Sequence, residues 1–132
     1  MLISTSINST LNINEVEVST NDTSQHVSLP PKATGFGSSI NGGELLMLSL
    51  AVCFCNDLYR EAKKRNIVLT GVEVSVSGEF GSEGEPGTKF EYKANVKSEA
   101  PCEDIKQLLA YTDTVAEVHN TLRKGVSISM VH

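Results

Sequence analysis

The residues best suited to chemistry are two cysteines near the middle of the chain. Cys53 and Cys55 lie at the end of an apolar segment, residues 45–55, which follows two glycines and Glu44. A helix that is apolar all round must be buried on all sides, so a thiol there is either a small hydrophobe or a guarded nucleophile. Apolar burial makes a thiol inert, whereas a neighbouring cation keeps it reactive. No arginine stands at a helical spacing that places it beside Cys53, so both interpretations stay open.

The Cys-x-Cys spacing is also found in chelates of soft metals. On a helix, however, side chains two positions apart point to nearly opposite sides. One ion could not take both Cys53 and Cys55 unless the helix unwound. We therefore expect no metal and no cofactor.

Two residues outside this segment could take part in the same chemistry. His119 stands in a later helical segment, and a Cys–His pair from two helices is a workable nucleophile arrangement. A surface or capped histidine is the competing interpretation. Cys102 stands at an expected helix start, where the helix dipole lowers a thiol pKa. The alternative is an incidental exposed cysteine.

The periodicity of the central residues predicts one long helix and a pair of strands. The helix is expected from about Glu44 to Arg65, after a loop over residues 32–43 that contains four glycines. Apolar and polar residues then alternate over residues 72–77 and 90–96, which predicts two half-buried strands. Residues 81–87 are expected to link them as a flexible hairpin loop.

The flanking regions predict shorter elements. Residues 1–8 are polar and expected to be loosely held, and residues 11–18 to form one or two strands with a bulge. A turn at residues 21–22 leads to a return strand at 26–29. A second helix opens at Cys102, breaks at residues 112–114 and is capped by Gly125, before a final strand at 126–130. This order predicts an α+β fold in a single domain, residues 1–132.

Composition excludes several kinds of partner. The net charge of −5 and the isoelectric point of about 5.1 argue against nucleic acid and anionic membranes. The apolar run is too short to span a bilayer, and no positive side chain precedes Lys32, so we expect no signal peptide and a cytoplasmic location. A buried apolar helix in so small a chain needs wrapping, which predicts a homodimer.

Several motifs together resemble one known family. They are His26-x-x-Leu29, the glycine-rich stretch, E-L-L-x-x-x-L-x-x-C over residues 44–53, and G-V-x-V from Gly71. They resemble the OsmC/Ohr family of osmotically inducible and organic-hydroperoxide-resistance proteins, over residues 24–131. The resemblance implies an OsmC-like fold, with antiparallel sheets wrapped around a long central helix in an intertwined dimer. It also implies that Cys53 attacks an organic hydroperoxide in a site at the dimer interface.

The chain departs from the family pattern at three positions. In the family, a second cysteine in C-P-V-x-x-T-L resolves the oxidised thiol, and an N-terminal arginine and a glutamate support the first thiolate. Here Ala116 stands at the position of the second cysteine, and no arginine precedes Arg60. The glutamate aligns with Gly43, one position from Glu44.

We therefore expect thiol-dependent reduction of organic hydroperoxides through Cys53, with His119 and Glu44 as weaker candidates. Cys55, Cys102 or an external thiol would complete the cycle. Two alternatives stay open: a non-catalytic dimer that binds a small apolar ligand at its interface, and cysteines that only fill the core. A cation near Cys53, from His119 or a partner chain, would discriminate between them.

Overall fold

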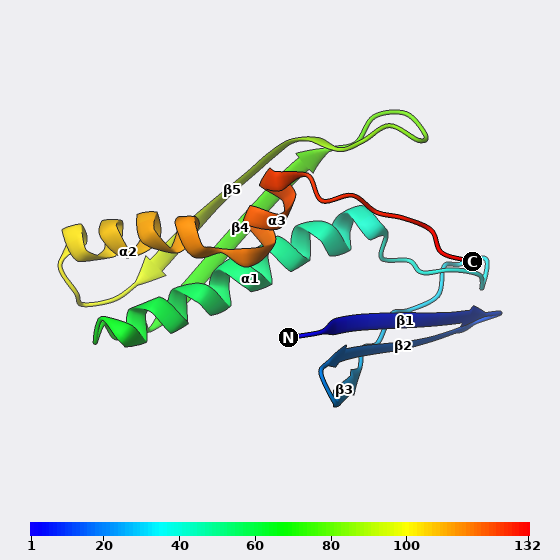
Figure 1. Ribbon diagram of the computed structural model, residues 1–132, viewed down its shortest axis with the longest axis horizontal. Coiled ribbons are helices and arrows are strands. Elements are labelled where there is room, and N and C mark those ends of the chain that lie inside the picture. Colours follow the sequence, from blue (N-terminus) through cyan, green and yellow to red (C-terminus); the bar gives the residue numbers. More distant parts are fainter. The chain divides into compact units, whose positions relative to one another are not determined.

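The computed structural model describes all 132 residues, and it confirms the α+β class. The chain divides into two compact units, residues 1–45 and residues 46–132. That residues 1–132 form a single domain stays a prediction. The elements follow one another as in Figure 1: β1 (Ile3–Thr10), β2 (Ile13–Thr20), β3 (Thr23–His26), α1 (Gly42–Lys64), β4 (Gly71–Glu79), β5 (Thr88–Lys97), α2 (Cys102–Val115) and α3 (Glu117–Lys124).

The first unit is built on an antiparallel sheet in the order β1-β2-β3. Two-residue turns join its strands, and Asn12 and Asn21 supply the left-handed backbone that such turns need, with φ of 61° and 51°. The expected turn at residues 21–22 is confirmed, but the return strand is Thr23–His26 and so lies earlier than expected. The turn, once placed, fixes the register of the strand that follows it.

The N-terminal segment differs from expectation. Residues 1–8 were expected to be loosely held, but residues 3–8 belong to strand β1, which continues to Thr10. Every β1 residue is exposed, so the segment is polar. A polar composition is also typical of a loosely held segment. The order comes instead from the ladder with β2, in which Ile3 pairs with Thr20 and Thr10 with Ile13. Backbone pairing of this kind leaves no trace in side-chain polarity.

Helix α1 begins two residues before the expected position and ends one residue before it. The Asn41 side-chain oxygen accepts from the Glu44 N–H at 2.8 Å, and the Glu44 carboxylate accepts from the Asn41 N–H at 2.9 Å. These reciprocal bonds form a capping box, which satisfies two amide groups that have no partner within the helix. Lys63 and Lys64 lie in the last turn, where they complement the helix dipole.

The second unit has a hydrophobic core formed by helices packed on a hairpin. Its buried centre comes from α1, α2 and the residue that follows α2, and consists of Phe54, Leu58, Ala62, Leu108 and Ala116. Half-buried residues of β4 and β5 pack against it, among them Val72, Val74, Tyr92 and Ala94. Leu58 and Leu108 are fully buried, and burial of one such side chain contributes roughly 1.5–3 kcal/mol.

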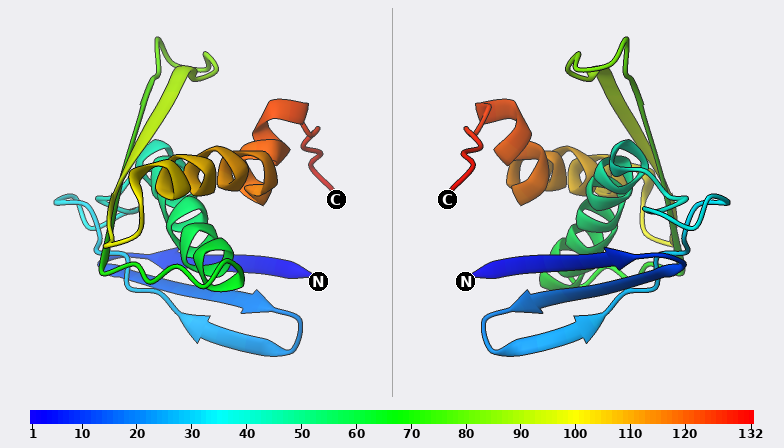
Figure 2. Two further views of the ribbon diagram at one scale, coloured as in Figure 1. Left: turned by 90° about the vertical axis from the view of Figure 1, so that its left-hand side faces the viewer. Right: turned by 90° about the vertical axis from the view of Figure 1, so that its right-hand side faces the viewer.

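Strands β4 and β5 form an antiparallel hairpin, as predicted, with a bulge between Ser77 and Glu79. Figure 2 shows its tip extending beyond the helices. Gly78 lies at the bulge, where a Cβ atom would come within 2.5 Å of the Phe90 ring. Glycine therefore lets the Phe90 ring lie against the strand backbone.

The C-terminal third required two corrections. The helix break lies at Ala116, with ψ of 106°, rather than at residues 112–114. Thr112 and Thr114 stay helical, and their hydroxyls donate to the carbonyls of Leu108 and Tyr111 within the same helix. Gly125 caps α3 as predicted, with φ of 65°. The expected strand over residues 126–130 is absent, since no neighbouring strand pairs with that segment.

Helix α1 is less covered than an all-apolar sequence suggests. Leu50 and Phe54 are buried, but Leu48 is 55 % exposed and Val52 is 48 % exposed. These two residues are one turn apart, so they form an uncovered stripe on the helix. None of the helices is both long and apolar enough to cross a membrane.

Candidate functional site

Cys53 lies half-buried in the middle of α1. Its thiol donates a hydrogen bond to Oδ2 of Asp57, one turn later in the helix, with an S–O distance of 3.5 Å. Asp57 itself is only 5 % exposed. The helical spacing of four residues places the two side chains on one face, so this pair follows from local sequence alone.

Helix α3 brings a second group of atoms to the same place. The break at Ala116 turns the chain so that the first residues of α3 face Cys53. A carboxylate oxygen of Glu117, one of Asp57 and the Cys53 sulfur lie within 4.8 Å of one another. The backbone amide of Val118 also acts on the Cys53 sulfur and lowers its pKa, as the amides of a helix N-terminus do.

Arg60 is the cation of this site, although sequence reasoning did not find it. Its Nη1 lies 2.8 Å from Asp57 Oδ1 and 3.2 Å from Glu117 Oε1. None of the arginines has a helical spacing that places it directly beside Cys53. The sequence signal for Arg60 was indirect: Asp57 lies four residues after Cys53, and Arg60 lies three residues after Asp57, so each pair shares a face of α1.

The thiol of Cys53 has a raised pKa. Burial is the largest cause, and the neighbouring carboxylates of Asp57 and Glu117 add to it, while the Val118 amide opposes them. Burial also raises the pKa of Asp57, against the pull of Cys53 and Arg60. The pKa of Glu117 is lowered, chiefly by its own backbone amide. Asp57 is therefore the carboxylate of this pair that takes up a proton more readily.

Cys53, Asp57 and Glu117 could supply three ligand atoms to a metal ion. The positive charge beside them, however, disfavours a cation at this place. Arg60 forms ion pairs with both carboxylates. A metal ion would have to displace this guanidinium or lie beside it as a like charge. The cluster therefore fits the arginine better than it fits a metal ion.

His119 is buried at 4 % exposure in a different environment from Cys53. Its ring packs edge-on against Tyr92, with centroids 4.6 Å apart, and tilted against Phe54 at 5.6 Å. Burial lowers its pKa, with the Arg123 charge as a smaller cause. It is not among the groups that shift the Cys53 pKa. The structure therefore gives no support to His119 as the cation beside the thiol.

The remaining candidates lie outside the Cys53 cluster. The Glu44 carboxylate closes the capping box of α1, and its role in a reaction stays a prediction. Cys55 is half-buried, Cys102 is exposed at the start of α2, and all three cysteines are free thiols. Ala116 is fully buried at the N-cap of α3, next to Glu117. Ala116, the residue next to the cluster, thus offers no thiol.

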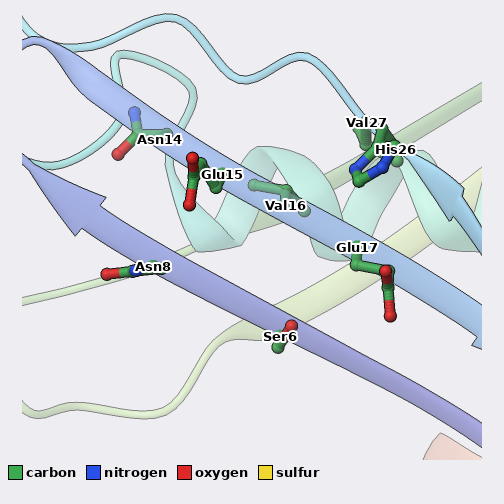
Figure 3. A pocket seen from close by; sticks show the side chains of 8 residues that line it. All are labelled: Ser6, Asn8, Asn14, Glu15, Val16, Glu17, His26 and Val27. Carbon is green, nitrogen blue, oxygen red and sulfur yellow. The ribbon is translucent and has the colours of Figure 1, made fainter.

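The hollows of the molecule include one in the first unit and one beside His119 in the second. The larger, about 570 Å³, lies on one face of the β1–β3 sheet (Figure 3), where Ser6, Glu17 and His26 stand side by side in register. Its charged side chains are exposed to solvent. The smaller, about 120 Å³, lies in the second unit and is lined by His119.

Comparison with known proteins matches one family. A family model described as OsmC-like protein matches residues 35–131. A search of curated proteins finds no match.

Solved structures with similar folds cover almost the whole chain. The OsmC like protein from Mycoplasma pneumoniae is 20 % identical, with a TM-score of 0.61 and coverage of 98 % of both chains. An organic hydroperoxide resistance protein OsmC from Legionella pneumophila is 19 % identical, with a TM-score of 0.61 and coverage of 98 % of this chain and 94 % of that one. One from Elizabethkingia anophelis, with thiocyanate bound, is 19 % identical, with a TM-score of 0.63 and coverage of 96 % and 91 %.

Proposed function

The chain belongs to the OsmC-like protein family, and on that premise we propose that it reduces organic hydroperoxides through the thiol of Cys53. Structural relatives carry the description organic hydroperoxide resistance protein. The observation that supports this function most directly is the hydrogen bond from the Cys53 thiol to Asp57. It links a half-exposed thiol to a buried carboxylate that can exchange its proton.

The geometry supports a specific route for that proton. Asp57 accepts the proton of Cys53, and the thiolate attacks the terminal oxygen of the hydroperoxide. The S–O bond forms while the O–O bond breaks, and the departing alkoxide takes the proton back from Asp57. The thiol has become a sulfenic acid and the hydroperoxide an alcohol, so atoms and electrons balance. Arg60 holds Asp57 and Glu117 in place through an ion pair with each of them.

The cycle is completed by an external thiol. Ala116 offers no sulfur beside the cluster. One molecule of a small thiol condenses with the sulfenic acid to a mixed disulfide and releases water, and a second releases Cys53 and leaves as the disulfide. The overall change is one hydroperoxide and two thiols to one alcohol, one disulfide and one water.

The uncovered stripe on α1 supports a dimeric protein. Leu48 and Val52 are about half exposed in the single chain, and α1 also carries Cys53. We propose that a second copy covers this stripe in a homodimer. Association of the two copies removes the apolar side chains of this stripe from water, which favours the dimer.

Consumption of cumene hydroperoxide in the presence of dithiothreitol, followed by stopped flow, tests the function. The Cys53→Ser variant should lose all activity, because a hydroxyl is a far weaker nucleophile than a thiol. The Cys55→Ser and Cys102→Ser variants are the matched controls and should keep most of it. Activity that survives in Cys53→Ser would refute the proposal.

The pH dependence of Cys53 alkylation by iodoacetamide, a reaction that needs only the free thiolate, tests the state of the thiol. Because burial raises the Cys53 pKa, the alkylation rate should still climb at about pH 9, above the ordinary thiol value of about 8.5. A rate that is flat from about pH 6 would mean a thiolate stabilised by a cation. No consumption of hydroperoxide at any pH would favour a non-catalytic dimer that binds a small apolar ligand.

A further inference from the structure

Glu117 is a charged group beside Cys53 that neither donates nor accepts a proton in the proposed reaction. Its carboxylate, that of Asp57 and the Cys53 sulfur lie within 4.8 Å of one another. The side chain is 65 % exposed and pairs with Arg60 at 3.2 Å. Its pKa is lowered, chiefly by its own backbone amide, so the carboxylate stays ionised at neutral pH. A lasting negative charge therefore lies next to the sulfur.

The charges around the sulfur become unequal once the thiol has reacted. In the proposed reaction Asp57 returns its proton to the alkoxide, so both carboxylates are ionised when Cys53 is a sulfenic acid. Arg60 is the cation that pairs with both of them, which leaves one net negative charge among these three groups. Strands β4 and β5 pack only uncharged residues, Tyr92 among them, against the core beside α1. The Val118 amide, a dipole and not a charge, is the group that favours an anion at the sulfur.

The negative charge bears on the next step of the sulfenic acid. A second hydroperoxide can oxidise it further: the sulfur attacks the terminal peroxide oxygen, a second S–O bond forms as the O–O bond breaks, and the alkoxide takes the hydroperoxide proton. The products are a sulfinic acid and an alcohol, so atoms and electrons balance. Thiols do not reduce a sulfinic acid, so this step ends the cycle. As for a thiol, the ionised form is the better nucleophile.

We infer that Glu117 protects Cys53 from this second oxidation, because a carboxylate within 4.8 Å of the sulfur keeps the sulfenic acid in its neutral form. The neutral S–O–H group can donate a hydrogen bond to a carboxylate, whereas the same carboxylate repels a sulfenate. Ala116 offers no thiol beside the cluster, so the sulfenic acid meets further hydroperoxide until an external thiol arrives. The inference rests on the proposed reaction of Cys53.

The test follows the second oxidation in the absence of any reducing thiol. The parent protein combines Cys55→Ser and Cys102→Ser, so that Cys53 is its only thiol. One equivalent of cumene hydroperoxide forms the sulfenic acid, which dimedone traps in a parallel sample. Excess hydroperoxide is then added, and mass spectrometry measures the rate at which the sulfinic acid appears as a function of pH.

Glu117→Gln keeps the size of the side chain and removes its charge. The rising part of its pH profile should lie about 0.3–0.6 pH units below that of the parent, which is an oxidation about 2- to 4-fold faster at a given pH, as expected for one screened charge at about 5 Å. A merely structural role of Glu117 would not move the profile along the pH axis. Glu117→Asp retains the charge and should keep the parent profile. Glu99→Gln removes an exposed charge outside the cluster and should also keep it.

The outcomes separate this inference from the proposed reaction. If dimedone labels Cys53 and the profile of Glu117→Gln coincides with that of the parent, the inference alone is refuted. An equal shift in Glu117→Asp or in Glu99→Gln would also contradict it, because the local charge would not be the cause. Absence of a dimedone adduct at Cys53 would refute both the proposed reaction and the inference.

Discussion

Replacing Asp57 with asparagine should make Cys53 more reactive toward an alkylating reagent and less reactive toward a hydroperoxide. The Asp57 carboxylate lies 3.5 Å from the sulfur and disfavours the thiolate. At this distance, the repulsion between two unit charges is about 1 kcal/mol at the dielectric of water and about 5 kcal/mol at an effective dielectric of 20. Because Cys53 is half-exposed and Arg60 offsets the carboxylate, we take the lower figure.

An energy of about 1 kcal/mol corresponds to roughly a fivefold larger thiolate fraction at neutral pH. Alkylation by iodoacetamide at pH 7, followed by mass spectrometry of the Cys53 peptide, should therefore speed up about fivefold in Asp57→Asn. Iodide leaves without a proton, so this reaction reports the thiolate alone. Hydroperoxide reduction in the same variant should slow, because an amide cannot return a proton to the departing alkoxide.

The control is Glu99→Gln, which removes one negative charge from an exposed residue outside the cluster. It should leave both rates unchanged. The reasoning fails if alkylation of Asp57→Asn is no faster than that of the wild type. If both reactions instead speed up equally, Asp57 affects only the charge of the thiol and plays no part in proton transfer.

Three further predictions concern stability and assembly. Leu58→Ala, at a fully buried position, should lower the free energy of unfolding in urea by about 2–5 kcal/mol, whereas Val68→Ala, at 76 % exposure, should change it by less than about 0.5 kcal/mol; similar losses would contradict the core described above. The folded-state pKa of His119 is lowered from its ordinary value of 6.5, so the unfolded chain binds more protons, and stability should fall as pH drops below about 6.5. This loss should shrink in His119→Leu, and an unchanged slope would mean that another group titrates. Leu48→Glu should convert a dimer to monomers or unfolded chains in sedimentation, while Val68→Glu should not; a folded wild-type monomer at micromolar concentration would refute the dimer.

The parts of the fold that local pattern determines were predictable. The apolar run and its flanking residues predict α1 to within two residues, and the alternation at residues 72–77 and 90–96 predicts the hairpin. Strand β1 and the missing strand at residues 126–130 were mispredicted. In both cases the outcome depends on whether a neighbouring strand takes up the backbone N–H and C=O groups, which the side chains of the segment do not encode.

Half of the candidate site was predictable in the same way. Cys53, Asp57 and Arg60 belong to one helix, so helical spacing alone sets the Cys53–Asp57 hydrogen bond and the Asp57–Arg60 ion pair. Arg60 contacts Asp57 and not Cys53, so a search for an arginine directly beside the thiol misses it. Asp57 connects the thiol of Cys53 to the guanidinium of Arg60, although the two residues are seven positions apart in the sequence.

Only the tertiary structure decided what α3 contributes. Glu117 and Val118 reach Cys53, and His119 turns instead toward Tyr92 and Phe54, because α2 breaks at Ala116. Ala116 is fully buried in the cluster with Phe54 and Leu58, so the break is set by how closely the helices pack. The sequence by itself determined that a cysteine, Cys53, lies on a largely apolar helix. Packing between residues more than sixty positions apart chose its neighbours, since dense interiors accept few arrangements of side chains.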